Sequence, residues 1–167
     1  MALSFRFFVY GNSNTLEQNV ATSNSYAGFD VKGNNNTLKQ NEAKENEPDG
    51  FYVQGNSNTL EQNVATSNNY DGFVVYGNSN TLKQNVATSN EYGFYVSGNK
   101  NTLKQNEAKE NVGDGFYVNG NSNVLKRNEA TGNKETGFVI NKTSTGNTVN
   151  GNSNTLEQNV ATEKQSS

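Results

Sequence analysis

Three aspartates stand immediately before a Gly-Phe pair and are the first candidates for chemistry: Asp49, Asp71 and Asp114. Carboxylates held about one strand spacing apart could share a proton, act as acid and base, or hold a calcium ion. Asp-Gly is also an ordinary turn sequence, and equivalent positions hold Tyr92 and Thr136. We therefore expect these aspartates to shape turns, with a weak calcium site as the alternative and no other cofactor.

Tyrosines form a second group of candidates, because they alternate with regularly spaced Phe and Val residues. Rings on the outward face of a strand could stack on sugar planes, while their hydroxyls make polar contacts. Aromatic residues on an exposed sheet also stabilise it by pairing with their neighbours, and we expect this role to dominate. The candidate sugar-stacking residues are Tyr52, Tyr95, Tyr117, Tyr10 and Tyr76.

Asparagine is the most informative polar residue, with 33 copies in 167 residues. Its side chain tolerates left-handed backbone at tight corners, and its amide carries both a donor and an acceptor. Stacked copies can therefore bond along a column, so that each buried amide is satisfied by its neighbours. We expect a structural ladder of Asn19, Asn41, Asn63, Asn85, Asn106, Asn128 and Asn159, and a second column of Asn24, Asn46, Asn68, Asn90, Asn111 and Asn133.

Several kinds of chemistry are disfavoured by composition. The chain has no His and no Cys, which removes the usual general base, the Ser-His triads and zinc–thiolate sites. Its 13 basic and 16 acidic residues form no basic stripe, so we expect no nucleic-acid partner. No apolar stretch is long enough to cross a bilayer. We assign no catalytic residues and expect a protein that is not an enzyme.

These residues are positioned by a repeat. Gly-Phe begins at 28, 50, 72, 93, 115 and 137, in steps of 22, 22, 21, 22 and 22 residues, and Phe7 lies one further step back. Each unit reads G-F-x-V-x-G-N-x-N-T-L-x-x-N-x-A-x-x-N, with apolar residues at four recurring positions. No helical period runs through the units, whereas Phe-x-Val has the alternation of a strand with one buried face.

Three short strands per unit, joined by Asn-rich corners, predict one coil of an all-β, single-stranded parallel β-helix, or β-solenoid. We expect one domain over residues 1–167, with seven coils starting near 7, 28, 50, 72, 93, 115 and 137. Residues 142–150 form an insertion at a corner, which is either a tolerated bulge or a binding loop. Residues 163–167 form a polar tail. Unpaired strand edges at the two ends favour weak end-to-end self-association.

The repeat resembles the parallel β-helix repeat of the pectin-lyase-like superfamily, especially its NosD-like and carbohydrate-binding or sugar-hydrolase members, over residues 7 to about 162. The resemblance implies a right-handed coil. It also implies a polysaccharide as a partner and an extracellular or periplasmic location. The superfamily includes lyases, hydrolases and non-catalytic proteins, and its uronan-cleaving members use clustered Asp, His, Lys or Arg. This chain has no His, its only arginines are Arg6 and Arg127, and its aspartates are Asp30, Asp49, Asp71 and Asp114.

Near-identical units, such as Gly11–Asn24 and Gly55–Asn68, fit either recent duplication or a designed repeat array. We therefore expect a non-catalytic structural or interaction scaffold. The alternative is a carbohydrate-binding module, or a vestigial polysaccharide-acting protein, that uses the tyrosine face.

Overall fold

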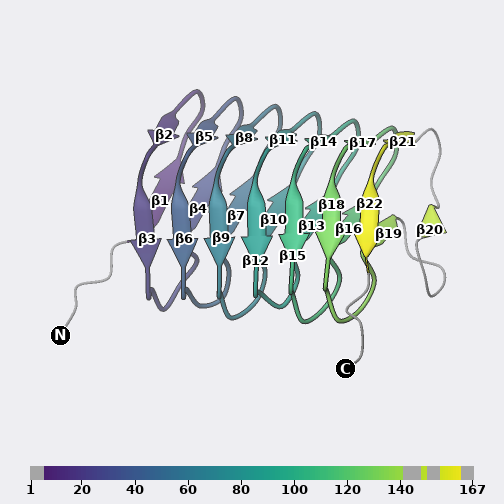
Figure 1. Cartoon of the computed structure of the whole chain (residues 1–167). Coiled ribbons are helices and arrows are strands. Elements are labelled where there is room, and N and C mark those ends of the chain that lie inside the picture. Colours follow the sequence, from purple (N-terminus) through teal and green to yellow (C-terminus); the bar gives the residue numbers. More distant parts are fainter. Residues whose placement is uncertain (1–5, 141–147, 150–154, 163–167) are drawn as a thin grey trace.

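The computed structural model describes residues 6–140, 148–149 and 155–162, and within these ranges the chain forms strands and turns without any helix. The chain winds into successive coils of three strands that stack along one axis as a rod (Figure 1). Every strand pairing is parallel, and every pairing except β19 with β20 joins a strand to its equivalent in the next coil. The prediction of an all-β parallel solenoid with three strands per coil is confirmed.

The strands form three sheets, which run along the length of the rod. Sheet A contains β1 (Phe7–Tyr10), β4 (Phe29–Lys32), β7 (Phe51–Gln54), β10 (Phe73–Tyr76), β13 (Phe94–Ser97), β16 (Phe116–Asn119), β19 (Phe138–Ile140) and β20 (Thr148–Val149). Sheet B contains β2 (Thr15–Glu17), β5 (Thr37–Lys39), β8 (Thr59–Glu61), β11 (Thr81–Lys83), β14 (Thr102–Lys104), β17 (Val124–Lys126) and β21 (Thr155–Glu157). Sheet C contains β3 (Val20–Thr22), β6 (Glu42–Lys44), β9 (Val64–Thr66), β12 (Val86–Thr88), β15 (Glu107–Lys109), β18 (Glu129–Thr131) and β22 (Val160–Thr162).

The core consists of four apolar columns, one residue of each kind per coil. Phe and Val from sheet A, Leu from sheet B and Ala from sheet C point inward and are fully buried in the central coils. Phenylalanine rings of adjacent coils stack with centroids 4.8 Å apart, as for Phe51 and Phe73. This equals the ~4.8 Å spacing of paired strands, so strand pairing and ring stacking reinforce each other. The columns open at both ends of the described rod, where Phe7 and Val9 are only partly buried and Leu156 is 39% exposed.

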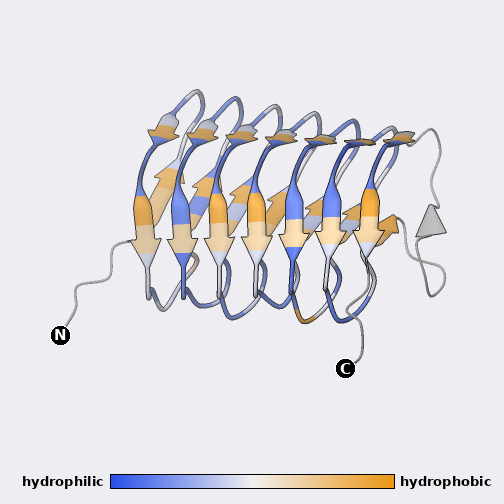
Figure 2. Ribbon diagram, in the orientation of Figure 1, coloured by the Kyte–Doolittle hydropathy of each residue, from blue (hydrophilic) through white to orange (hydrophobic). Residues whose placement is uncertain are grey.

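The outward positions vary while the interior repeats. In Figure 2 the first residue of the sheet C strands changes between hydrophobic and hydrophilic from coil to coil, with Val in β3 and β9 and Glu in β6 and β15. Inward alanine remains constant in the same strands. The alternation of buried and exposed positions follows the pleat of a strand whose two faces meet different environments.

Asparagine ladders complete the corners, as predicted. Asn85 donates from Nδ2 to the Leu60 carbonyl at 2.8 Å and to Oδ1 of Asn106 at 3.0 Å. Its own Oδ1 accepts from the backbone N–H and the Nδ2 of Asn63, at 2.9 and 3.0 Å. The same pattern recurs along the column and in the second predicted column, for example around Asn68. Each buried amide is thus satisfied by the coils on both sides.

Two further ladders were not predicted. The buried column Asn36, Asn58, Asn80, Asn101 and Asn123 also links coil to coil. An exposed column runs in the opposite sense, since the backbone N–H of Asn56 donates to Oδ1 of Asn34 in the preceding coil.

Asparagine tolerates left-handed backbone, but the ladder asparagines do not adopt it. The residue with positive φ is the one immediately before each ladder amide, for example Gln84 at 55° and Ser89 at 57°. Residues of several types occupy these positions. Asparagine is therefore required at the ladder position for its paired donor and acceptor, and the backbone turns one residue earlier.

Glycine is required directly after the sheet A strands β4, β7, β10, β13 and β16, where the backbone approaches that of the preceding coil closely. Gly77 has φ of +129°, and a Cβ added there would lie 2.0 Å from the carbonyl oxygen of Gly55. No side chain fits at that distance.

The predicted insertion lies mostly outside the described residues. Within it, β20 pairs in parallel with β19 and extends sheet A, with Thr148 opposite Val139. The predicted polar tail, residues 163–167, lies outside the described residues.

Candidate functional site

The candidate tyrosines lie on the outward side of sheet A, which we call the tyrosine face. Tyr52 and Tyr76 have ring centroids 5.9 Å apart, and Tyr76 and Tyr95 are 5.8 Å apart, with the planes tilted by 57° in both pairs. Tyr95 and Tyr117 are parallel within 2° at 5.1 Å. Because β7, β10, β13 and β16 are in register, four tyrosines form one continuous row.

The row is partly packed against itself. Parallel rings 5.1 Å apart cover one face of each other, so Tyr95 and Tyr117 do not offer a flat double platform. Val74 and Val139 occupy the outward position of sheet A that holds Tyr52 and Tyr117 in neighbouring coils, but they are only 5% and 2% exposed. Val74 pairs in register with Tyr95, and Val139 with Tyr117, so each valine lies beside a larger outward residue. Tyr76 differs, because it is 37% exposed and neither neighbouring ring lies parallel to it.

Tyr10 lies apart from this row and is linked to it by a lysine. Lys32 Nζ donates to the Tyr10 hydroxyl at 3.2 Å and lies 5.2 Å from the Tyr10 ring centroid and 5.7 Å from that of Tyr52. This hydrogen bond raises the pKa of Lys32, burial lowers it, and the charge of Asp30 raises it again. One Asp30 oxygen lies 3.7 Å from Lys32 Nζ, and the other is buried without a hydrogen-bond partner.

The three candidate aspartates support the corners between sheets C and A. Asp49 accepts a hydrogen bond from the backbone N–H of Asp71 at 3.1 Å, and Asp71 accepts one from the N–H of Tyr92. Asp114 accepts from the N–H of Thr136 at 3.0 Å. Asp49 and Asp71 are in adjacent coils, whereas Tyr92 separates Asp71 from Asp114. Within the described ranges, no group of three or more metal-ligating carboxylates forms, and calcium binding stays a prediction.

A hollow of about 440 Å³ opens beside these corners, and we call it the acidic hollow. It joins two of the candidate aspartates to two of the candidate tyrosines. Tyr70 and Tyr92 are not among the candidates predicted from the sequence. Their positions are visible in the repeat, because Tyr70 directly precedes Asp71-Gly72 and Tyr92 directly precedes Gly93, which places both at the corner before sheet A. The hollow is lined by Tyr70, Asp71, Tyr92, Tyr95, Asp114 and Tyr117.

Burial and like charge perturb the ionisable groups of the hollow. The pKa of Asp71 is raised to about 7, chiefly by burial and then by the charge of Asp49, against a lowering by the hydrogen bond from Tyr92. Burial also raises the pKa of Asp49. The pKa of Tyr92 is raised first by burial and then by the negative charges of Glu135, Asp114, Glu91 and Asp71. Every charge that perturbs these groups is negative.

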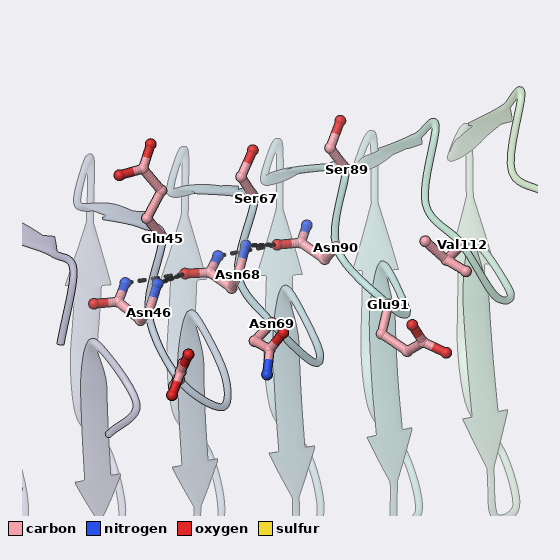
Figure 3. Close-up of a pocket in the computed structure, with 10 residues that line it drawn as sticks. Glu45, Asn46, Ser67, Asn68, Asn69, Ser89, Asn90, Glu91 and Val112 are labelled. Atoms are coloured by element: carbon pink, nitrogen blue, oxygen red, sulfur yellow. Dashed lines mark hydrogen bonds between the residues drawn. The ribbon is translucent and has the colours of Figure 1, made fainter. Parts of the chain in front are cut away.

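A second depression, of about 460 Å³, follows the corner after sheet C (Figure 3). The amides of Asn46, Asn68 and Asn90 lie in a row along it and are hydrogen-bonded to one another. Since these amides already serve the ladder, they are not free for a ligand. Glu45 and Glu91 lie on its rims.

The part of the chain that the structure describes contains no helix long and apolar enough to cross a membrane.

Comparison with known proteins supports the architecture. The family described as "Right handed beta helix region" matches residues 44–164, which is most of the chain. Comparison with curated proteins and with solved structures gave no match. The family model describes a β-helix, and the structure shows stacked parallel coils over the matched residues that it describes. Both are consistent with the resemblance to the pectin-lyase-like superfamily. The chain therefore belongs to the right-handed β-helix family.

Proposed function

We propose that this β-helix is a non-catalytic interaction scaffold, a rod that holds outward side chains at fixed spacing for a binding partner. The observation that carries the proposal is the contrast between a repeated interior and a changing exterior. Phe, Val, Leu and Ala recur at the inward positions of successive coils, whereas outward positions of sheet A change between Asp, Tyr and Val. Register fixes the outward side chains at steps of ~4.8 Å.

The bonding of the aspartates supports a non-catalytic role. Asp49, Asp71 and Asp114 each accept a hydrogen bond from a backbone N–H in the next coil. These bonds hold one coil against the next. A structural role therefore explains why aspartates occupy these corners, and no catalytic role is needed to explain them. Raised carboxylate pKa values accompany structural burial as well as catalysis, so the pKa of Asp71 does not by itself indicate an enzyme.

A second candidate function, saccharide binding, is favoured by the geometry at Tyr76. Tyr76 is 37% exposed, and the plane of its ring makes an angle of 57° with the rings of both Tyr52 and Tyr95. A sugar plane could therefore stack on Tyr76 with Tyr52 beside it, which the parallel pair further along the face would not allow. On this proposal the ligand is a neutral glycan chain that lies along the tyrosine face.

A glycan array followed by affinity electrophoresis in polysaccharide gels tests both candidates. If a glycan binds the tyrosine face, the variant Tyr52→Ala/Tyr76→Ala should bind it at least about tenfold more weakly, because both stacking rings are removed. A tenfold loss corresponds to ~1.4 kcal/mol of binding free energy. Tyr26→Ala is the matched control, because Tyr26 is 61% exposed but lies at a corner next to Arg6. Retention of full binding by the double variant would exclude this face.

The non-catalytic part of the proposal has its own measurement. The intact protein should release neither reducing ends nor unsaturated products from any polysaccharide it is given. Release of either product, lost in the Asp71→Asn variant, would overturn the proposal that this scaffold is not an enzyme.

A further inference from the structure

The acidic hollow owes its shape to the shortest coil of the repeat. The step from Gly72 to Gly93 is 21 residues where the others are 22. As a result Tyr92 stands where Asp71 and Asp114 stand in the coils on either side, directly before the glycine. A phenol ring is thereby inserted into a column of carboxylates.

A glycine in the next coil makes room for this ring. A Cβ added to Gly113 would lie 2.6 Å from Cε1 and 2.8 Å from Cδ1 of Tyr92. The ring therefore lies directly over the backbone at Gly113. Tyr70 contributes a ring that is 57% exposed, and the stacked pair Tyr95 and Tyr117 forms another side of the hollow.

The charged residues that line the hollow, and the charges that act on Asp71 and Tyr92, are negative. Asp71 and Asp114 line it, and Asp114 is only 4% exposed. The negative charges of Glu91 and Glu135 also act on Tyr92. No Lys or Arg is among the residues that line the hollow. A cation that entered it would meet carboxylates and the electron-rich faces of aromatic rings.

The kind of cation follows from the kinds of group present. Calcium requires six to eight oxygen ligands, and the described residues form no group of three metal-ligating side chains here. A quaternary, methylated ammonium carries its charge on a weakly hydrated, partly apolar surface, which suits aromatic rings flanked by carboxylates. The hollow's volume of about 440 Å³ is in the range of small-ligand sites.

We propose that the acidic hollow binds a methylated ammonium group, with the rings of Tyr70 and Tyr92 contacting the methyl groups and the carboxylates of Asp71 and Asp114 balancing the charge. The inference does not depend on glycan binding. It uses the corner residues of the coils, whereas the saccharide would stack on Tyr52 and Tyr76.

Calorimetric titration of the intact protein with choline tests the proposal. Its neutral isostere, 3,3-dimethylbutan-1-ol, has the same shape without the charge and serves as the matched ligand. We expect choline to bind at least about tenfold more tightly than the isostere at pH 8. Equal affinity of the two ligands, or no binding of choline, would overturn the proposal and would leave the saccharide proposal unaffected.

Two variants locate the site. Asp71→Asn/Asp114→Asn keeps acceptors for the backbone N–H groups of Tyr92 and Thr136 but removes the charge, so choline affinity should fall about tenfold while the circular dichroism spectrum stays that of the parent. Tyr92→Leu should weaken binding by a similar factor. Glu45→Gln, which removes a charge from the other depression, is the control and should leave affinity unchanged. Unchanged choline affinity in the double Asn variant would refute the assignment.

The source of the group is resolved by a third arm of the titration. Choline represents a free small molecule, and a short peptide with one trimethyllysine represents a modified protein. Tighter binding of the peptide than of choline would assign the hollow to a protein partner, and the reverse would assign it to a small molecule. Either result supports a methylated ammonium as the ligand.

Discussion

A ladder asparagine in the middle of the rod should contribute more to the free energy of unfolding than a ladder asparagine at the end of the rod. In Asn85→Ala, the buried backbone N–H of Asn63 loses its acceptor and the Leu60 carbonyl loses the Asn85 amide donor. Two other partners keep a bond each, because Asn63 Nδ2 still donates to Leu38 and Asn106 Oδ1 still accepts from the backbone N–H of residue 85.

The expected loss of stability follows from the hydrogen bonds that Asn85→Ala removes. The Asn63 N–H becomes a buried donor without a partner, which costs about 1–3 kcal/mol. The Leu60 carbonyl keeps its place in the pairing of β8 with β11 and loses one bond, worth about 0.5–1.5 kcal/mol, so the free energy of unfolding should fall by roughly 1.5–4.5 kcal/mol. Asn19→Ala in the first described coil removes the bond from its Nδ2 to Asn41 Oδ1, an oxygen that still accepts from the Asn19 backbone N–H. That variant should lose only about 0.5–1.5 kcal/mol.

Urea unfolding followed by circular dichroism measures both variants against the parent. The comparison uses the same residue type in the same column, so side-chain volume and helix or strand propensity cancel. Equal destabilisation of the two variants would refute the claim that neighbouring coils satisfy the ladder amides. Asn85→Asp extends the test, because it adds a buried charge and should be more destabilising at pH 7 than at pH 3.

The remaining predictions concern backbone packing, pH, calcium and the ends of the rod. Gly77→Ala should destabilise far more than Gly132→Ala, because the added Cβ would lie 2.0 Å from a carbonyl at Gly77 but 3.6 Å from the nearest side-chain atom at Gly132; thermal melts of the pair decide this, and similar melting temperatures would contradict it. The Asp71 pKa of about 7 lies above its unfolded value, so this group's stabilising effect is complete at low pH and is lost as pH rises from about 4 to about 7. Asp71→Asn should therefore raise the free energy of unfolding by roughly 2–4 kcal/mol at pH 8 and change little near pH 3, in urea titrations at the two pH values, and a pH-independent effect would count against it. Calcium should leave the melting temperature unchanged, and a rise would instead support the calcium alternative. Light scattering should show weak association that grows with concentration, since strands β1, β2 and β3 lie at sheet edges among the described strands, and a constant monomer mass at high concentration would refute this.

Much of the fold could be predicted because the contacts repeat with the sequence. A residue such as Phe73 stacks on residues 22 before and 21 after it, so each position in one unit reports on its partners in the next. The inward columns and two of the asparagine ladders follow from this rule. The backbone at the corners did not, because a left-handed residue followed by an inward amide cannot be distinguished by composition from a left-handed asparagine.

The tyrosine face was correctly placed on one sheet from alternation alone, but its packing was decided by the tertiary structure. Alternation tells which side of a strand a ring leaves from, while its tilt and the cover it gives depend on neighbours in three dimensions. Tyr95 and Tyr117 therefore lie parallel, Tyr76 stands tilted, and Val74 is buried at a position that the repeat marks as outward.

The sequence by itself determined the period, the inward columns and the parallel winding, since a strict repeat leaves one way to bury four apolar residues per unit. Only the tertiary structure brought Tyr70, Tyr92 and two aspartates around one hollow. A single missing residue in one coil shifts a tyrosine into the aspartate column, and the result depends on side-chain directions at corners from three coils. Those directions are set by packing between coils, which no single unit of the repeat encodes.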